Sequence, residues 1–122
     1  MKKFFKRIFR KPAILLVTIW AKRTYRQGVD AAERQHRITG TTIYLAADSW
    51  RPDRLVTYDR FRFRAEKKVY GMSARLLTMH TLRRGCYYHT ADSQGKNGMA
   101  PEEVERRRRA FIKERIRLAG LA

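Results

Sequence analysis

Side chains that could do chemistry are few in this sequence, and their spacing forms no recognised catalytic or metal-binding pattern. The three histidines are scattered and share no metal-ligand spacing with the single cysteine, Cys86. A thiol nucleophile would need Cys86 with His89 or His80, an alternative that stays open although no further pattern supports it. A lone cysteine forms no internal disulfide and does not indicate an oxidising compartment, so we expect a half-buried apolar residue.

A metal-dependent nuclease site could be imagined from Asp48, Asp53 and Asp59. Two of these three fall at turn or helix-cap positions, where aspartate commonly binds the backbone. The glycines at 28, 40, 71 and 85 are isolated, so no phosphate-binding loop is present. The sequence therefore predicts a protein that is not an enzyme and has neither a metal nor a cofactor.

Charge is the strongest signal. Among 122 residues, 29 are Lys or Arg and 11 are Asp or Glu, which gives a net charge of +18 and a pI near 11.1. So dense a positive field normally meets DNA, RNA or anionic lipid, and a component of a larger assembly is favoured over a solitary monomer. Hydrophobic residues make up 43% of the chain, so part of it should fold.

The first 26 residues combine bases with large apolar side chains. Phe4, Phe5, Ile8 and Phe9 are spaced for one face of a helix, and with Trp20 they are candidates for docking on a partner or a membrane. Pro12 predicts a kink or a new helix start. The candidate nucleic-acid-binding bases on the opposite face are Lys2, Lys3, Lys6, Arg7, Arg10 and Lys11.

This segment permits several interpretations. No small-x-small site follows its apolar run, so we do not expect a cleaved secretion signal. Residues 13–21 would span about 14 Å as a helix, whereas a bilayer core needs roughly 20 residues. The remaining alternatives are a helix docked on this domain, a protein partner or nucleic acid, and a helix lying on a membrane surface.

The rest of the chain predicts an α+β fold, a small antiparallel β-hairpin or sheet with basic amphipathic helical extensions at both termini. Strands are expected at 41–47 and 54–58 around a turn at 48–53, with a brief strand at 86–90. Asp59 should cap a helix over 60–70, Gly40 should end the first helical region, and Gly28 suggests a bend within it. We divide the chain into a helical arm (1–40), a core (41–90), a linker (91–100) and a C-terminal helix (101–122).

Two further basic stretches are candidates for nucleic-acid binding. In the middle of the chain, aromatic residues alternate with bases that could stack on unpaired nucleotides and bind phosphates. In the terminal helix, an arginine run could lie along phosphates, although four glutamates could pair with it at i+4. The candidates in these stretches are Arg51, Arg54, Arg60, Arg62, Arg64, Lys67, Lys68, Arg106, Arg107, Arg108 and Arg109.

The segment AAERQHRITGTTIYLAADSWRPDRLVTYDRF, preceded by a basic amphipathic start, resembles small basic proteins of uncharacterised function from tailed-phage and prophage gene sets. The similarity covers the middle third of the chain, beginning with Ala32, His36, Thr39 and Gly40. It implies a virion or assembly component near packaged DNA and assigns no site residues. In this context we expect His36 to bind the backbone near Gly40.

These observations predict a non-enzymatic basic structural or assembly protein that binds DNA or RNA and docks on neighbouring proteins, with a phage virion component as the leading interpretation. A ribosomal or ribosome-associated RNA-binding protein is the first alternative, because charge, size and tails suit it equally well. A peripheral membrane protein bound through its N-terminus is the second. We expect it in a virion or a cytoplasmic assembly, with no small-molecule substrate.

Overall fold

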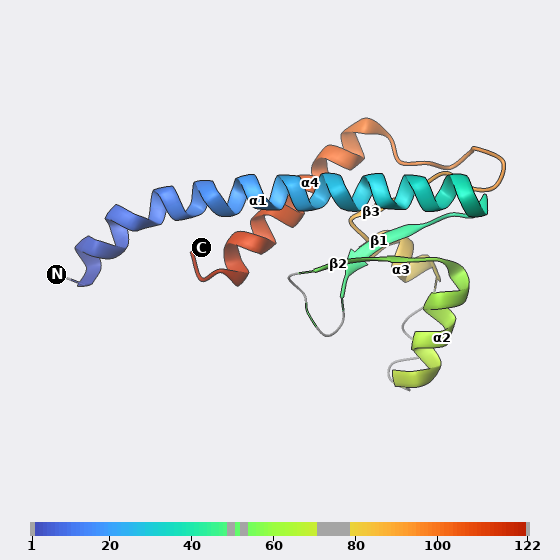
Figure 1. Cartoon of the computed structure of the whole chain (residues 1–122), viewed down its shortest axis with the longest axis horizontal. Helices are drawn as coiled ribbons and strands as arrows, with labels where there is room; N and C mark the ends of the chain where they lie inside the picture. The colour runs from blue at the N-terminus through green and yellow to red at the C-terminus, as the bar shows by residue number, and fades with distance from the viewer. Residues whose placement is uncertain (1, 49–50, 52–53, 71–78, 122) are drawn as a thin grey trace.

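The chain combines helices at both ends with a small antiparallel sheet, which confirms the expected α+β class (Figure 1). The computed structural model describes residues 2–48, 51, 54–70 and 79–121, and the side chains of 11–48, 51, 54–65 and 82–121. The elements are α1 (Lys2–Thr39), β1 (Tyr44–Ala47), β2 (Leu55–Tyr58), α2 (Arg60–Tyr70), α3 (Met79–Gly85), β3 (Tyr88–His89) and α4 (Pro101–Leu118).

Helix α1 is one continuous helix of 38 residues, about 57 Å long at the usual rise. The new helix start expected at Pro12 was therefore wrong, because α1 begins before Pro12 and continues through it and through Gly28 without interruption. It ends where expected: Gly40 has φ +70° and donates its N–H to the His36 carbonyl at 2.7 Å. The N-terminal part of α1 projects well beyond the rest of the molecule (Figure 1).

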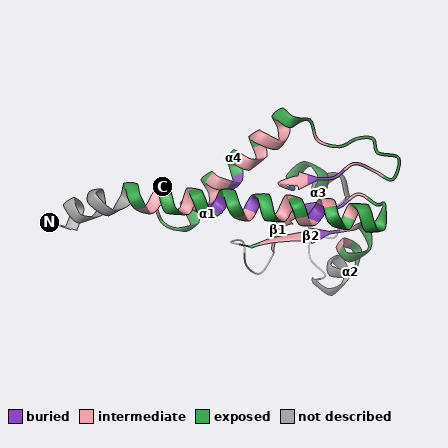
Figure 2. Cartoon of the chain, turned by 45° about the horizontal axis from the view of Figure 1, so that its top comes forward, coloured by how far each residue is buried: buried purple, intermediate pink, exposed green. Residues whose placement is uncertain are grey.

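One stripe of α1 faces the body of the protein. Ala21, Tyr25, Gly28 and Ala32 recur at the spacing of a single helical face, and the first, second and fourth are buried (Figure 2). Gly28 explains why the sheet can approach closely, because a Cβ there would lie 2.9 Å from the methyl groups of Leu45. The glycine is thus a packing residue.

The three strands form an antiparallel sheet in the order β2-β1-β3. β1 pairs with β2 as the expected hairpin, with Tyr44 opposite Tyr58, and with β3, with Tyr44 opposite His89. Side chains alternate between the two faces. Leu45 faces α1, while Tyr44 and Tyr58 pack with Cys86 on the other face, beside the half-buried Leu82 of α3.

A cluster of three aromatic rings joins the two terminal helices. Phe111 of α4 is buried against Tyr25 of α1, with ring centroids 5.9 Å apart, and against Tyr87 at 5.2 Å. The Tyr25 hydroxyl donates to the Tyr87 carbonyl at 2.7 Å, and burial raises the pKa of this phenol to about 12. The terminal helices, expected as extensions of a core within 41–90, therefore build part of the core themselves.

The expected helix boundaries also agree with the structure. The Asp59 carboxylate accepts the Arg62 N–H at 2.6 Å at the start of α2. Pro101 opens α4, Glu102 and Glu103 occupy its first turn, and Gly120 follows its end with φ +73°.

Candidate nucleic-acid interface

The arginines of α4 are largely engaged by carboxylates of their own helix. Glu103 binds Arg106 at 2.5 Å and Arg107 at 2.8 Å. Hydrogen bonds from these two guanidinium groups lower the pKa of Glu103 to about 2, so the carboxylate stays ionised at neutral pH. The other pairs within α4 are Glu105 with Arg108 and Arg109, and Glu114 with Arg117.

Arg107 has a structural role that the sequence did not reveal. Its guanidinium donates to the carbonyls of Cys86 at 2.7 Å and Arg83 at 3.1 Å, and its side chain is only 16% exposed. It therefore ties α4 to the end of α3 and the start of β3. Although it belongs to the expected set of nucleic-acid-binding residues, its hydrogen bonds are directed into the protein, so we leave it out of the interface proposed below.

The cations of α1 stand in a different environment. Lys22, Arg23 and Arg26 are exposed, and no ion pair in the described part of the chain includes any of them. No acidic residue occurs before Asp30. The positive charge of this part of α1 is therefore not neutralised by neighbouring carboxylates, unlike that of α4.

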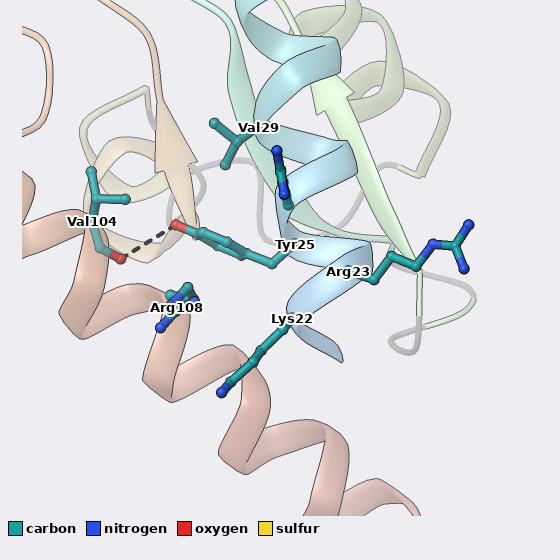
Figure 3. A pocket seen from close by; sticks show the side chains of 7 residues that line it. Lys22, Arg23, Tyr25, Val29, Val104 and Arg108 are labelled. Atoms are coloured by element: carbon teal, nitrogen blue, oxygen red, sulfur yellow. Dashed lines mark hydrogen bonds between the residues drawn. The ribbon is translucent and has the colours of Figure 1, made fainter. Parts of the chain in front are cut away.

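An open groove of about 440 Å³ lies beside these cations, between α1 and α4 (Figure 3). Lys22 and Arg108 extend toward the gap from the two helices, with Tyr25 between them, whereas Arg23 extends away along the other side of α1. The groove wall also includes Arg26, Val29 and Val104. Cations and aliphatic side chains around the buried Tyr25 ring suit a phosphate-bearing chain.

Neither Lys22, Arg23 nor Arg26 was among the sequence-based candidates. The available signal was the lack of acids before Asp30, but only the packing of α4 on α1 shows that these cations border a groove. We therefore treat Lys22 and Arg26 as its principal cationic residues, and Arg108, which is paired with Glu105, as part of its wall.

The middle basic stretch forms a more dispersed surface. Arg51, Arg54, Arg60, Arg62 and Arg64 are exposed, and the Arg62 guanidinium lies 5.2 Å from the centre of the Tyr58 ring. Tyr58 itself is buried, whereas Phe61 is 75% exposed. The aromatic residues here are thus divided between core and surface, and only the exposed ones could stack on a base.

Several candidates have side chains outside the described set, so the structure places their backbones in α1 or α2 and says nothing of their side chains. They are Lys2, Lys3, Phe4, Phe5, Lys6, Arg7, Ile8, Phe9, Arg10, Lys67 and Lys68. Lys11, the remaining base of the N-terminal set, is exposed, and so is Trp20. None of the helices within the described residues is both long enough and apolar enough to span a bilayer.

The described side chains of Cys86, His89 and His36, which were considered for catalysis, are buried or contact the backbone. Cys86 is buried, and burial raises the pKa of its thiol. Burial lowers the pKa of His89, whose Nδ1 lies 3.1 Å from the Thr90 carbonyl oxygen. His36 contacts the Thr41 carbonyl through Nδ1 at 2.8 Å, as expected for the helix end.

Within the described residues, no cluster of His, Cys, Asp or Glu could hold a metal ion. Asp59 caps α2, and the backbone N–H of Asp48 binds the Arg54 carbonyl in the hairpin. The positions of Asp53 and of the His80 side chain lie outside the described residues.

Comparison with known protein families, curated proteins and solved structures finds no match to this chain.

Proposed function

We propose that this chain is a non-enzymatic basic structural protein that binds nucleic acid through the groove between α1 and α4 and docks on neighbouring proteins. The observation that carries the proposal is the contrast between the two helices. Arg106 to Arg109 and Arg117 of α4 have carboxylate partners, whereas Lys22 and Arg26 border an open groove and have no ion pair among the described residues. A polyanion is the partner that this charge distribution favours.

The form of the groove supports a backbone-binding role. Aliphatic surface of the half-buried Val29 and Val104 lies among the cations, so a strand could place its phosphates on Lys22 and Arg26 and its sugars against that surface. Base-specific recognition is not required for such binding. This mode of binding to the phosphate backbone, together with the resemblance of the middle third to phage proteins, favours a virion component in contact with packaged DNA.

The salt dependence of binding tests the proposal. Affinity of the full chain for duplex DNA and for single-stranded RNA should fall steeply with salt, because each neutralised phosphate releases counterions. In the variant Lys22→Gln with Arg26→Gln, binding should weaken and the slope of log K against log salt should decrease by up to about 2 for duplex DNA. Fluorescence anisotropy with a labelled oligonucleotide measures both.

The chain offers a matched control. Arg106→Gln with Arg109→Gln removes the same formal charge from residues that are 75% and 78% exposed but paired with glutamates. This variant should change the slope much less. Affinity that is independent of salt would exclude the nucleic-acid role, and equal effects of the two double variants would exclude the groove as its site.

A further inference from the structure

A second surface of α1 has no role in the groove. Leu15, Leu16, Ile19 and Trp20, which we call the α1 ridge, are 60%, 68%, 56% and 60% exposed. The spacing i, i+1, i+4, i+5 places them on one side of the helix, away from the buried stripe that includes Ala21. Single exposed apolar residues are ordinary, but four neighbours on one helical face indicate an interaction surface.

The continuity of α1 extends this face in the sequence. Positions 4, 5, 8 and 9 precede the ridge by eleven residues, and eleven residues are close to three full turns of an α-helix. Because α1 does not restart at Pro12, the two sets of apolar positions share one face of one helix. The ridge positions therefore continue a helical face whose earlier positions, 4, 5, 8 and 9, are also apolar in the sequence.

The charges beside the ridge indicate its occupant. Lys11 precedes it, Lys22 and Arg23 follow it, and no acid occurs before Asp30. A second copy of this chain would bring like charges together along such a contact. Nucleic acid would satisfy the cations but would leave the aliphatic side chains in water. An anionic lipid surface is complementary to both, with apolar residues and Trp in the interface and Lys and Arg at the headgroups.

We propose that α1 docks on an anionic lipid surface through the α1 ridge, lying in the plane of the interface. The ridge is coupled to the body of the protein, because the guanidinium of the buried Arg115 in α4 lies 5.0 Å from the centre of the Trp20 ring. Docking would therefore hold the whole domain at the surface. The four ridge residues do not line the groove, and the inference does not rest on nucleic-acid binding.

Flotation of the full chain with vesicles tests the inference. The chain should float with vesicles of phosphatidylcholine and phosphatidylserine and remain behind with phosphatidylcholine alone. Leu16→Gln with Ile19→Gln should weaken partitioning by about tenfold or more, because two apolar side chains no longer enter the interface. Both positions are exposed, so the variant should keep its circular dichroism spectrum and its melting temperature.

Ile38 provides a matched control at the other end of the same helix. Ile19→Gln alone should reduce partitioning, whereas Ile38→Gln, at a side chain that is 84% exposed, should not. Affinity of the double variant for an oligonucleotide should be unchanged, which separates this inference from the proposed function.

Four results would overturn the inference. The wild-type chain could fail to float with anionic vesicles, or float equally well with neutral ones. The ridge variants could float as the wild type does. Finally, a lipid-free dimer that the double variant converts to a monomer would assign the ridge to a second copy of the chain.

Discussion

At the scale of single residues, neighbouring arginines in one run have different roles. Arg106 is 75% exposed and bonds only within its own helix, whereas Arg107 points inward and bonds two carbonyls at the end of α3. The run from 106 to 109 looks uniform in the sequence. The difference arises from the direction of each side chain around α4 and from what that helix packs against.

This contrast gives a stability prediction. Arg107→Gln should lower the free energy of unfolding by about 2 kcal/mol, because hydrogen bonds from a charged group to the Cys86 and Arg83 carbonyls are lost. Arg106→Gln should change it by less than about 0.5 kcal/mol, as for other exposed ion pairs. Urea denaturation of both variants measures the difference, and equal effects would contradict the structural role of Arg107.

The capping residues and turn glycines could be predicted because their signals are local. Asp59 and Gly40 act within a few residues of their own positions, so the sequence around them contains the necessary information. Lys22 and Arg26 could not be identified as groove residues in the same way. Their setting depends on α4, whose contact residue Phe111 lies far along the chain from Tyr25.

At the scale of elements, the approach of α1 to the sheet depends on Gly28. In the sequence this glycine suggested a bend, because glycine weakens helices. The structure shows instead that space for Leu45 and Leu55 requires a residue without a side chain, since a Cβ would lie 2.9 Å and 3.4 Å from their methyl groups. Pro12 also suggested an interruption of the helix. In the structure α1 continues through Pro12, although proline cannot donate a backbone hydrogen bond.

Gly28→Ala should therefore destabilise the protein although alanine favours helices. Leu45 is only 1% exposed and has little space to move, so overpacking of about 1–3 kcal/mol should exceed the helical gain of about 1 kcal/mol. Gly85→Ala is the control, because no atom lies within 4 Å of its added Cβ and its φ is ordinary. Thermal melts compare the two, and a Gly28→Ala variant as stable as the wild type would show that the helix and sheet separate easily.

At the scale of the whole molecule, a net charge of +18 opposes compactness. The ion pairs within α4 neutralise charge locally, whereas Lys22, Arg23 and Arg26 of α1 have no ion pair among the described residues. Screening of this repulsion should stabilise the fold. The total charge is evident from composition and the pairing within α4 from its i+4 spacing, whereas the position of the α1 cations beside a groove emerges only from the packing of α4 on α1.

The melting temperature should therefore rise as sodium chloride is added from low ionic strength, because the Debye length shortens to about 10 Å at 0.1 M. Differential scanning fluorimetry of the full chain across a salt series measures this. A melting temperature that falls over the same range would mean that attractive ion pairs outweigh the repulsion.

The contact between Tyr25 and Phe111 also has a consequence for synthesis. A chain that grows from its N-terminus presents Ala21 and Tyr25 long before Phe111 exists to cover them. At about 5–20 residues per second, this interval lasts seconds. During that time the nascent helix carries uncovered apolar residues on two sides, the ridge and the future core, so its first encounters on emerging from the ribosome are with other molecules rather than with its own last helix.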